Sequence, residues 1–383
     1  MLRSKLLAAA LPMRTRVVFA WALSASCGAL IGCGAVEDSD AGTAEDAAPR
    51  AAAADVSDVD DGCGAPLEQS LDAPWAVPPT GQRCCYDGGQ RVDCAGVDCG
   101  DGANAALCGQ DAQRGGNSRQ FVSETVDGDA VVHDSLTGLV WQSDALDGVT
   151  AQEATDHCSG LDFAGESDWR VPEIQELATL IDYGRYAPAS NFPAMIPDSY
   201  WSSNVDLNEP FLPWLADFSF GALRRQTNAD DTRPVRCVQG QMPTWPGERY
   251  SISGDSGQEV MRDQATGLQW QQTLDDASAH LRWEAAIEHC EQLEYGGHDD
   301  WRLPNIQELR GLLDYTHAQP ASAVPGMIAD YFWSSSTTYA YPQTAWHIHS
   351  HMGSLLYAHK SFSDINGEDF GMGAKCIRTP EAQ

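Results

Sequence analysis

The sequence predicts a mixed α+β fold that is built twice within one chain. The first observation behind this prediction is a repeat: the ten residues DWRVPEIQEL, which begin at Asp168, return as DWRLPNIQEL at Asp300. The second observation is that each copy combines several short strand patterns with two amphipathic helix patterns. Since the C-terminal two thirds of the chain is one unit of about 120 residues present twice, an account of function has to be an account of that unit.

Further landmarks recur in the same order along the chain. The separation between equivalent residues grows from 129 at Thr137 to 132 at Asp168 and 139 at Arg236, which indicates small insertions between the landmarks. The matching pairs are Thr137-Gly138 with Thr266-Gly267, His157-Cys158 with His289-Cys290, Trp201-Ser202-Ser203 with Trp333-Ser334-Ser335, and Arg236-Cys237-Val238 with Lys375-Cys376-Ile377. We divide the chain into a signal segment (1–32), an acidic tether (33–62), a cysteine-rich spacer (63–117), repeat 1 (118–240) and repeat 2 (241–383).

The N-terminus has the features of an export signal. Arg14 and Arg16 precede an apolar run, residues 17–31, which is too short for a comfortable membrane span. The run ends in the letters LIGC, which resemble the lipobox of bacterial lipoproteins. The resemblance implies that Cys33 is lipidated and anchors the chain to a membrane of the bacterial cell envelope, where the outer membrane is the expected destination. An ordinary signal peptide with a chance cysteine is the alternative.

The chain that follows Cys33 is strongly acidic. It has 19 basic and 55 acidic residues, a net charge of −36. Such a field repels nucleic acid, anionic lipid and sulfated glycans at long range, so we expect no nucleic-acid partner. Residues 34–62 lack the large apolar side chains that a core requires, and we expect them to form a flexible tether.

Each repeat is predicted to open with a hairpin and a helix. Residues 130–134 and 139–141, like residues 259–263 and 268–270, are short apolar runs around an Asp-x-x-Thr-Gly turn. The helix of repeat 1 begins with a capping-box pattern at Thr150 and Glu153. The apolar face of this helix consists of Ala154, Cys158 and Leu161 in repeat 1 and of Trp283, Ala286, Cys290 and Leu293 in repeat 2.

The Trp-Arg-x-Pro segment is predicted to begin a second helix. Pro172 and Pro304 would occupy its first helical position, where proline costs no hydrogen bond. Its apolar face consists of Ile174, Leu177, Leu180 and Ile181 in repeat 1 and of Ile306, Leu309, Leu312 and Leu313 in repeat 2. Three strands follow in each copy: the Trp-Ser-Ser strand, a strand over 214–220 or 346–352, and a last strand that holds Cys237 or Cys376.

Twelve cysteines in an exported chain indicate disulfide bonds. Six of them lie in residues 63–117, where few aliphatic residues are available to form a core and the pairing is not determined by the sequence. In the repeats we expect Cys158 to pair with Cys237 and Cys290 with Cys376, each bond stabilising its domain by about 4–5 kcal/mol. Bridges between the two repeats are the alternative.

These motifs, taken in order, resemble the Lcl C-terminal domain family. The signature comprises Thr-Gly-Leu-x-Trp, the helix cysteine, Asp-Trp-Arg-Leu-Pro-x-x-x-Glu-Leu, Trp-Ser-Ser and a closing Arg-Cys-Val, and it covers roughly residues 121–378. Repeat 2 departs from it at the end, with Lys375 in place of arginine. The family is similar to the C-type-lectin-like superfold. This implies two C-type-lectin-like domains, each with a small twisted antiparallel sheet, two helices and a disulfide from helix to last strand.

The resemblance, the lipid anchor and the tandem units favour a surface-anchored binding or adhesion module for a glycan or protein ligand, because two weak sites on one chain gain avidity. One alternative is a structural envelope spacer without a specific ligand. Another is an enzyme similar to the formylglycine-generating enzymes, which share the superfold and need reactive cysteines. Because both cysteines of each repeat fit structural positions and no catalytic motif stands out, we expect neither enzymatic activity nor a cofactor.

Ligand specificity is expected where the two copies differ, chiefly in the loop after Trp-Ser-Ser and in the strand that follows it. The candidate ligand-binding residues are Trp201, Asn204, Asp206, Trp214, Trp333 and Trp346. In repeat 1, Asn204, Asp206, Asn208 and Glu209 also form a secondary candidate for a calcium site, because C-type lectins carry calcium-binding loops in this region.

Two other groups of residues have a structural and a functional interpretation. His347, His349 and His351 alternate along a predicted strand and are secondary candidates for zinc or copper ligands, the alternative being an exposed polar strand face. For the repeated Trp-Arg pair we favour the structural interpretation, in which Trp169 and Trp301 pack in the core. Arg170 would then pair with Glu176, and Arg302 with Glu308.

Overall fold

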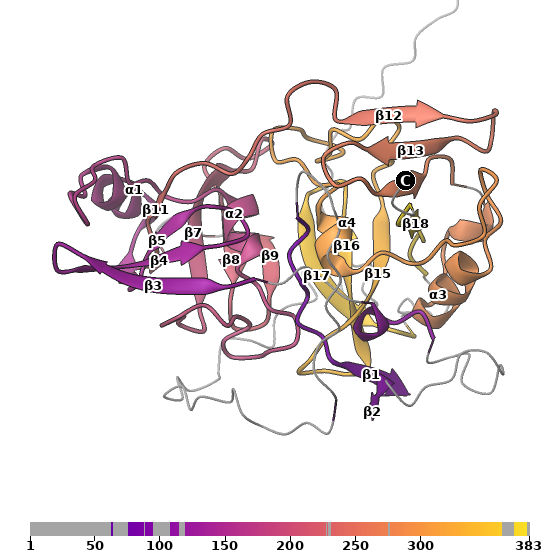
Figure 1. Ribbon diagram of the computed structural model, residues 1–383, viewed down its shortest axis with the longest axis horizontal. Helices are drawn as coiled ribbons and strands as arrows, with labels where there is room; N and C mark the ends of the chain where they lie inside the picture. Colours follow the sequence, from indigo (N-terminus) through magenta and orange to yellow (C-terminus); the bar gives the residue numbers. More distant parts are fainter. Residues whose placement is uncertain are drawn as a thin grey trace, which may run out of the picture. The chain divides into compact units, whose positions relative to one another are not determined.

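The computed structural model describes residues 63, 76–87, 89–94, 108–114, 119–226, 228, 231–274, 276–361 and 371–380. The predicted lipidation of Cys33 and the tether lie outside the described residues. Within the described ranges the chain forms antiparallel sheets and four short α-helices, so the α+β class is confirmed (Figure 1). Of the helices in these ranges, none combines the length and the apolar character that a membrane span requires.

The two repeats present similar elements in the same order. The elements of repeat 1 are β3 (Phe121–Val126), β4 (Asp129–Asp134), β5 (Val140–Gln142), β6 (Leu146–Val149), α1 (Ala151–Ser159), α2 (Ile174–Thr179), β7 (Ser199–Val205), β8 (Pro213–Asp217), β9 (Ala222–Arg225), β10 (Arg233–Val235) and β11 (Val238–Gln239). Those of repeat 2 are β12 (Tyr250–Ser253), β13 (Val260–Asp263), β14 (Gln269–Gln271), η4 (Asp276–Ser278), α3 (Trp283–Glu291), α4 (Ile306–Arg310), β15 (Tyr331–Thr337), β16 (Thr344–His349), β17 (Ser354–His359) and β18 (Ile377–Arg378). The N-terminal segment adds β1 (Cys84–Asp87), β2 (Gln90–Asp93) and η3 (Asp111–Gln113).

The predicted hairpin and first helix are confirmed. Strands β4 and β5 pair antiparallel, and so do β13 and β14. The N-cap Thr150 accepts a hydrogen bond from the Glu153 amide, and the Glu153 carboxylate accepts one from the Thr150 amide at 2.9 Å. Ala154 and Cys158 on α1 are fully buried, as the helical spacing predicted.

The second helix begins later than predicted. Helix α2 starts at Ile174 with Glu173 as N-cap, so Pro172 lies before the helix and not at its first position. The reason is the preceding segment, which pairs with the last strand: the Arg170 amide donates to the Val238 carbonyl at 3.0 Å, and the reverse bond is 2.9 Å. The chain can turn into the helix only after this bridge. The strands predicted over 214–220 and 346–352 are also shorter, since β8 ends at Asp217 and β16 at His349.

The repeated Trp-Arg pair is structural in both copies. Arg170 holds Glu176 through two hydrogen bonds of 2.7 and 2.6 Å, and Arg302 holds Glu308 through bonds of the same lengths. Both tryptophans are buried, and each indole N–H donates to a main-chain carbonyl within its own repeat, at 3.0 Å. The structural interpretation of these residues is therefore confirmed.

Each repeat is closed by one disulfide. Cys158 is bonded to Cys237 and Cys290 to Cys376, which are the pairings expected within a repeat. All four residues are buried, and each bond lies within a small hydrophobic cluster of its own repeat. In the N-terminal segment the structure pairs Cys63 with Cys84 and Cys85 with Cys94.

A single six-stranded antiparallel sheet, which the sequence did not predict, joins the repeats. Its strand order is β15-β16-β17-β9-β8-β7, so three strands come from each repeat. The junction is the pair β9 and β17, where Leu223 lies opposite Leu355 (Figure 1). These two leucines are themselves equivalent at the repeat offset of 132 residues. The strands thus meet on an axis of internal pseudo-two-fold symmetry.

Side chains along this junction, which we call the seam, obey the same symmetry. Gln175 on α2 donates to the Leu313 carbonyl at 2.7 Å, and Gln307 on α4 donates to the Ile181 carbonyl at 3.1 Å. Both pairs are related by the offset of 132 residues. A contact in which i meets j and j meets i is the mark of the isologous interface of a two-fold dimer. The seam is therefore such an interface within one chain.

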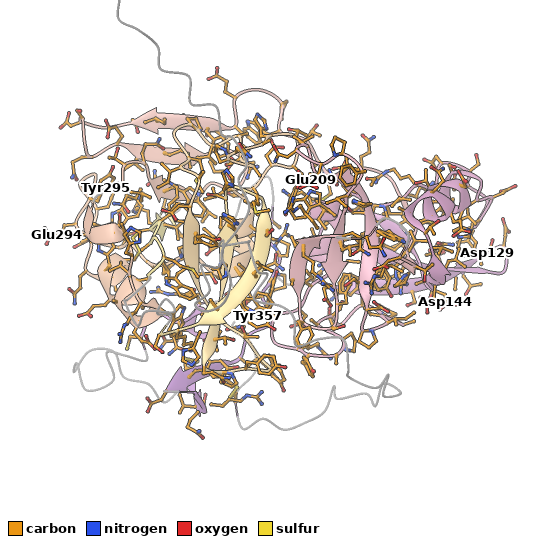
Figure 2. The ribbon with its side chains drawn as sticks, turned by 180° about the vertical axis from the view of Figure 1, so that it is seen from behind. Asp129, Asp144, Glu209, Glu294, Tyr295 and Tyr357 are labelled. Atoms are coloured by element: carbon orange, nitrogen blue, oxygen red, sulfur yellow. A yellow bond between two sulfur atoms is a disulfide. The ribbon has the colours of Figure 1, made fainter. Side chains whose placement is uncertain are left out.

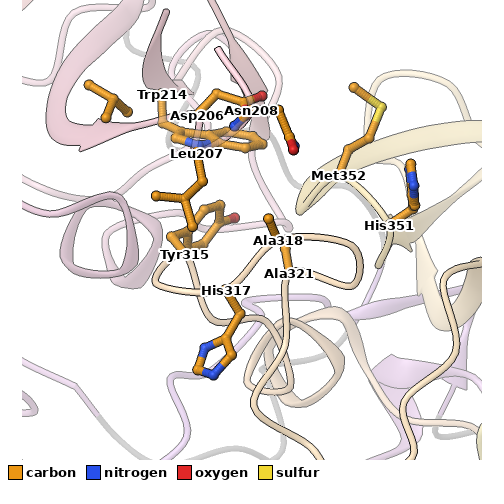
Figure 3. Close-up of a pocket in the computed structure, with 11 residues that line it drawn as sticks. Asp206, Leu207, Asn208, Trp214, Tyr315, His317, Ala318, Ala321, His351 and Met352 are labelled. Atoms are coloured by element: carbon orange, nitrogen blue, oxygen red, sulfur yellow. The ribbon is translucent and has the colours of Figure 1, made fainter. Parts of the chain in front are cut away.

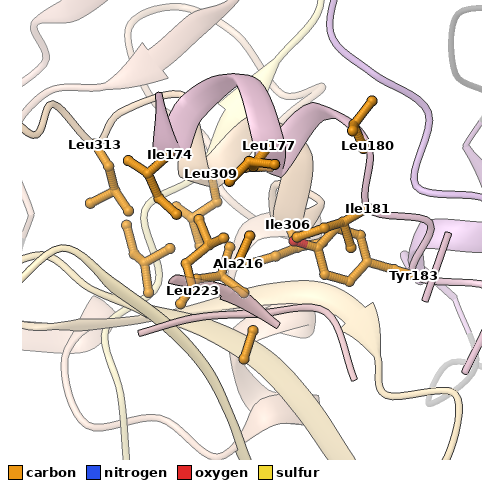
Figure 4. Packing of buried hydrophobic residues seen from close by; sticks show 14 of the residues in the cluster. Ile174, Leu177, Leu180, Ile181, Tyr183, Ala216, Leu223, Ile306, Leu309 and Leu313 are labelled. Carbon is orange, nitrogen blue, oxygen red and sulfur yellow. The ribbon is translucent and has the colours of Figure 1, made fainter. Parts of the chain in front are cut away.

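The main hydrophobic core also crosses the seam. Figure 4 shows side chains of α2, such as Leu177, in one cluster with side chains of α4, such as Leu309, and with Leu223 of β9. Tyr183 packs edge-on against Trp346 with 5.1 Å between ring centroids, and the equivalent Tyr315 packs against Trp214 at 4.9 Å. The resemblance implies two domains, each with its own small sheet, whereas the structure gives the two repeats a common six-stranded sheet and a common core.

The described part of the cysteine-rich segment, predicted to be a spacer, lies across both repeats, and we call residues 76–87 the strap. In repeat 1, the amides of Tyr183 and Gly184 donate to the Thr80 carbonyl at 2.7 and 3.2 Å. In repeat 2, Gln82 hydrogen-bonds the main chain of Thr337 through both its amide oxygen and its amide nitrogen. The approach is so close that a Cβ added to Gly184 would lie 2.0 Å from the Gly81 oxygen.

We expect Gln307→Ala to destabilise both repeats together. Gln307 is buried. Its side chain donates to the Ile181 carbonyl across the seam and accepts from the Arg310 guanidinium next to it, and the substitution removes both hydrogen bonds. The free energy of unfolding should fall by roughly 2 kcal/mol. Denaturant unfolding measures this fall, and hydrogen exchange should show faster opening in β8 and β9 of repeat 1 as well.

Gln152→Ala is the matched control, because Gln152 is exposed on α1 and hydrogen-bonds Asp156 at 2.9 Å. It should change stability by less than about 0.5 kcal/mol. Faster exchange confined to repeat 2 in the Gln307 variant would show that the repeats unfold independently.

Candidate functional site

A cleft opens at the seam, where a loop of repeat 1 faces two loops of repeat 2. It has about 240 Å³ of space, part of which is open to solvent (Figure 3). The lining residues of repeat 1 are Val205, Asp206, Leu207, Asn208 and Trp214, and those of repeat 2 are Tyr315, His317, Ala318, Ala321, His351 and Met352. Since each repeat supplies part of the wall, the site exists only in the tandem arrangement.

The floor of the cleft is rigid and largely apolar. Trp214 and Tyr315 are buried and pack edge-on, and the Tyr315 hydroxyl is fixed by donating to the Gly353 carbonyl at 2.8 Å. The rim includes Leu207, which remains 47 % exposed. A fixed apolar floor with an accessible rim is typical of a site that binds a small group without rearrangement.

The loop of repeat 1 is shaped by one carboxylate. Asp206 accepts a hydrogen bond from the Asn208 amide at 2.7 Å and one from Arg225 at 2.8 Å. Glu209 also pairs with Arg225, at 3.5 Å. Burial opposes ionisation of Asp206, but these hydrogen bonds outweigh it and lower its pKa. The carboxylate therefore stays charged and braces the loop.

The secondary calcium candidate does not have the geometry of a cation site. The Arg225 guanidinium occupies the position next to Asp206 and Glu209 that a calcium ion would have to take. Asn204 is also engaged, because its side-chain oxygen accepts the Ile174 amide at 2.8 Å at the start of α2. Both residues thus fix the main chain of repeat 1, although Asp206 still lines the cleft.

Three of the four tryptophans proposed as ligand-binding residues lie in the core, which corrects that prediction. Trp201 and Trp333 are 1 % and 0 % exposed, and their indoles donate to the carbonyls of Val149 and Leu281 at 2.7 and 2.8 Å. Trp346 is buried against Tyr183. Their size and flatness fill the interior. Trp214 alone among the four lines the cleft, as part of its floor.

The three histidines have different surroundings, although the rings of His349 and His351 lie 5.8 Å apart between centroids. His347 is buried beside Trp333 with 5.9 Å between ring centroids, and burial lowers its pKa to about 4. His349 instead stacks on Tyr331 at 4.1 Å, and His351 lies in the turn after β16. Among the described residues, no group of three His, Cys, Asp or Glu side chains is placed to hold a metal ion. The exposed polar face considered as the alternative is also wrong for His347.

The cysteines of the repeats show whether either repeat has a free thiol. Residues 118–383 contain four cysteines, and all four form the two buried disulfides described above. Neither repeat therefore holds a free thiol of the kind that a formylglycine-generating enzyme uses.

Sequence reasoning pointed to one side of the cleft and to part of the other. The loop after Trp-Ser-Ser in repeat 1 was expected to carry specificity, and its residues 205–208 line the cleft. On the opposite wall, His351 and Met352 belong to the predicted strand 346–352, whereas the loop with Ala318 gave no motif. A comparison of the copies at the offset of 132 could have found it, since Ala318 stands where repeat 1 has Tyr186.

A buried carboxyl group joins the N-terminal segment to repeat 2. Asp111 accepts hydrogen bonds from Thr80 at 3.1 Å and from the hydroxyl of Ser336 on β15. Burial raises its pKa to about 7, against the lowering effect of the two hydroxyl groups. The strap and η3 are thus held to repeat 2 by a group that changes charge near neutral pH.

Comparison with known proteins supports the tandem arrangement. The family model of the Lcl C-terminal domain matches residues 130–239 and 259–365, more than half of the chain in two segments. The two segments contain every residue that lines the cleft. No curated protein matches the chain.

We expect Asp111→Asn to reduce the dependence of stability on pH. The pKa of Asp111 rises from an ordinary 3.8 to about 7 on folding, so between these values the folded chain keeps a proton that the unfolded chain loses. The stabilisation from this group is complete below pH 3.8 and is lost as the pH rises through 7. It amounts to at most about 4 kcal/mol. Free energies of unfolding at pH 5 and pH 8 should therefore differ less in the variant than in the natural chain.

The control is Asp156→Asn, which removes an exposed carboxylate of α1 and should leave the difference between the two pH values unchanged. If Asp111→Asn also left that difference unchanged, Asp111 would not be the group that titrates.

Proposed function

Because the chain belongs to the Lcl C-terminal domain family, we propose that it is a binding module, without enzymatic activity, that takes a glycan or protein ligand in the cleft at its seam. The observation that carries the proposal is the cleft itself. Both repeats build it, and it lies at a loop where the copies differ in sequence. A site between two tightly joined units is pre-organised, and pre-organisation lowers the entropic cost of binding.

The size of the cleft limits what it can hold. The 240 Å³ includes open solvent, so the enclosed part is far smaller than a pocket that surrounds a drug-sized molecule. A shallow opening of this kind can contact one group of a larger ligand, such as a sugar ring or a side chain, but it does not enclose a whole molecule. Affinity for a single contact of this kind is low, so adhesion would depend on many copies of the chain on one surface.

The proposed setting is the surface of a bacterial cell. It rests on the lipobox-like residues that end at Cys33 and on the acidic tether that follows. A lipid at Cys33 would hold the chain at the outer membrane, and the tether would extend the repeats away from it. Attachment through one end leaves the cleft available to ligands on another cell or molecule.

The alternative is an envelope spacer without a ligand. Deleting one repeat does not distinguish the two functions, because the repeats share a sheet and a core and the remaining copy would lose its packing. A substitution that fills the cleft while leaving the seam intact is the sharper test.

We expect Ala318→Tyr to abolish ligand binding on glycan and surface-protein arrays. A tyrosine at this position fits the local backbone, since repeat 1 has Tyr186 there, and its ring would fill the cleft. Residues 34–383 contain every residue that the structure describes and serve as the array probe. Binding should fall at least about tenfold, which corresponds to 1.4 kcal/mol.

Val122→Tyr is the matched control, because Val122 is 52 % exposed on β3 and is not part of the cleft. It should leave array binding unchanged. An absence of any ligand for the natural chain would favour the spacer.

We expect Cys33→Ala to release the chain from the membrane fraction of cells. The substitution removes the sulfur that carries the lipid, while the apolar run of 17–31 is too short to act as a stable anchor. Fractionation of cells that produce either form checks this. An unchanged membrane fraction for Cys33→Ala would contradict lipid anchoring at this residue.

A further inference from the structure

The pseudo-two-fold symmetry of the seam gives the cleft a counterpart on the other side of the axis. From Asp168 to Gln226 the repeats align without a gap at the offset of 132 residues. Each residue that lines the cleft therefore has an equivalent in the opposite repeat. The counterpart shows which side chains can fill a site of this kind.

Aromatic rings fill the counterpart. Tyr186 and Phe220 of repeat 1 lie 5.3 Å apart between ring centroids, and Phe220 stacks on Tyr341 of repeat 2 at 6.2 Å. Tyr357 on β17, which is labelled in Figure 2, extends the group, with 6.0 Å between its ring centroid and that of Tyr341. Rings from both repeats thus pack where the two units meet.

The cleft is open because its own residues lack these rings. Ala318 stands in place of Tyr186, and Met352 in place of Phe220. Glu209 and Arg225 replace Tyr341 and Tyr357, so that an ion pair of 3.5 Å takes the place of the stacked rings. Because Ala318 has no ring, a space remains beside the flexible thioether of Met352. Thioethers make favourable contacts with aromatic rings.

The counterpart also binds a length of main chain. The Tyr183 amide donates to the Thr80 carbonyl of the strap at 2.7 Å. Its equivalent in the cleft is the Tyr315 amide, which has no hydrogen-bond acceptor within the part of the chain that the structure describes. The main-chain amide that donates to a peptide carbonyl on one side of the axis thus has no such acceptor on the other side.

The strap itself does not suit the cleft. Gly184 allows the Gly81 carbonyl to approach within 2.0 Å of where a Cβ would be, and its equivalent is Thr316, which has a Cβ. A peptide that bonds to the Tyr315 amide must therefore leave in another direction. This disfavours the strap of a second copy as the occupant.

The charge around the cleft determines which charge a bound ligand should carry. The segments that line it carry the carboxylates of Asp206, Glu209 and Asp314; Arg225 pairs with the first two, and the His317 imidazole lies 3.2 Å from the third. An excess of negative charge remains, and the chain as a whole has a net charge of −32. Such a field attracts cationic segments and repels anionic ones.

We propose that the cleft receives an aromatic side chain from a basic peptide segment of a partner protein. The ring would occupy the space next to Ala318 and Met352 that Tyr186 fills in the counterpart. A main-chain carbonyl of the segment would accept from the Tyr315 amide, and its basic residues would face Asp206, Glu209 and Asp314. This inference rests on the proposed function, whose ligand class it narrows from glycan or protein to peptide.

The test uses three short peptides on the full chain. Titration calorimetry or ligand-observed NMR would compare acetyl-Lys-Tyr-Lys-amide with acetyl-Lys-Leu-Lys-amide and acetyl-Glu-Tyr-Glu-amide. The first should bind about tenfold more tightly than either of the others, because only it combines the ring with positive charge. Equal binding of the first two peptides would overturn the proposal, as would equal binding of the first and third.

Two substitutions locate the site. Ala318→Tyr should weaken binding of acetyl-Lys-Tyr-Lys-amide at least about tenfold by filling the space, and Val122→Tyr should not. Tyr186→Ala removes a ring that is 40 % exposed from the counterpart, where the Tyr183 amide is already bonded to the strap, so it should leave binding of the same peptide unchanged. Tight binding that persists in Ala318→Tyr would overturn the assignment to the cleft.

Methyl glycosides are a further probe, which distinguishes the proposed binding function from the peptide inference. If they bind, lose binding in Ala318→Tyr, and the peptides do not bind, the binding function stands and the peptide inference is wrong. If neither probe binds and the arrays are also negative, both proposals are wrong.

Discussion

The pairing of Leu223 with Leu355 is the contact on which the rest of the molecule depends. Without this pairing, β9 and β17 would each be an edge strand that exposes unpaired main-chain groups. The same contact sets the register for the reciprocal glutamine bonds and brings α2 and α4 over one core. The cleft follows from it as well, since its two walls belong to different repeats. A change in this register would move both walls at once.

Much of each repeat could be predicted from the sequence, because the deciding interactions are local. The hairpin before Trp141, the capping box at Thr150 and the Arg170–Glu176 pair depend on residues near one another in the chain, and the structure contains all three. The start of α2 could not be predicted, since a bridge to Val238, far along the chain, delays it. Helical spacing also marked Leu180 and Ile181 as buried, although both lie beyond the end of α2.

The seam and the cleft could not be predicted for a different physical reason. A single copy shows which face of a strand is apolar, but it does not show that the free edge of β9 meets the same edge of the other copy. The tryptophans were assigned to the site on chemical grounds, and Trp201 and Trp333 turned out to hold the interior through indole hydrogen bonds. Alanine and methionine, which carry no distinctive chemistry, define the open space.

The reciprocal form of the seam has a consequence for how such a molecule can change over generations. In a dimer of identical subunits every substitution appears on both sides of the axis, so a gap and a filled site cannot coexist. Once the two subunits are parts of one gene, each side is free to vary. Tyr186 and Ala318 show such a difference between equivalent positions: aromatic rings close one side of the axis, and the other side has the cleft.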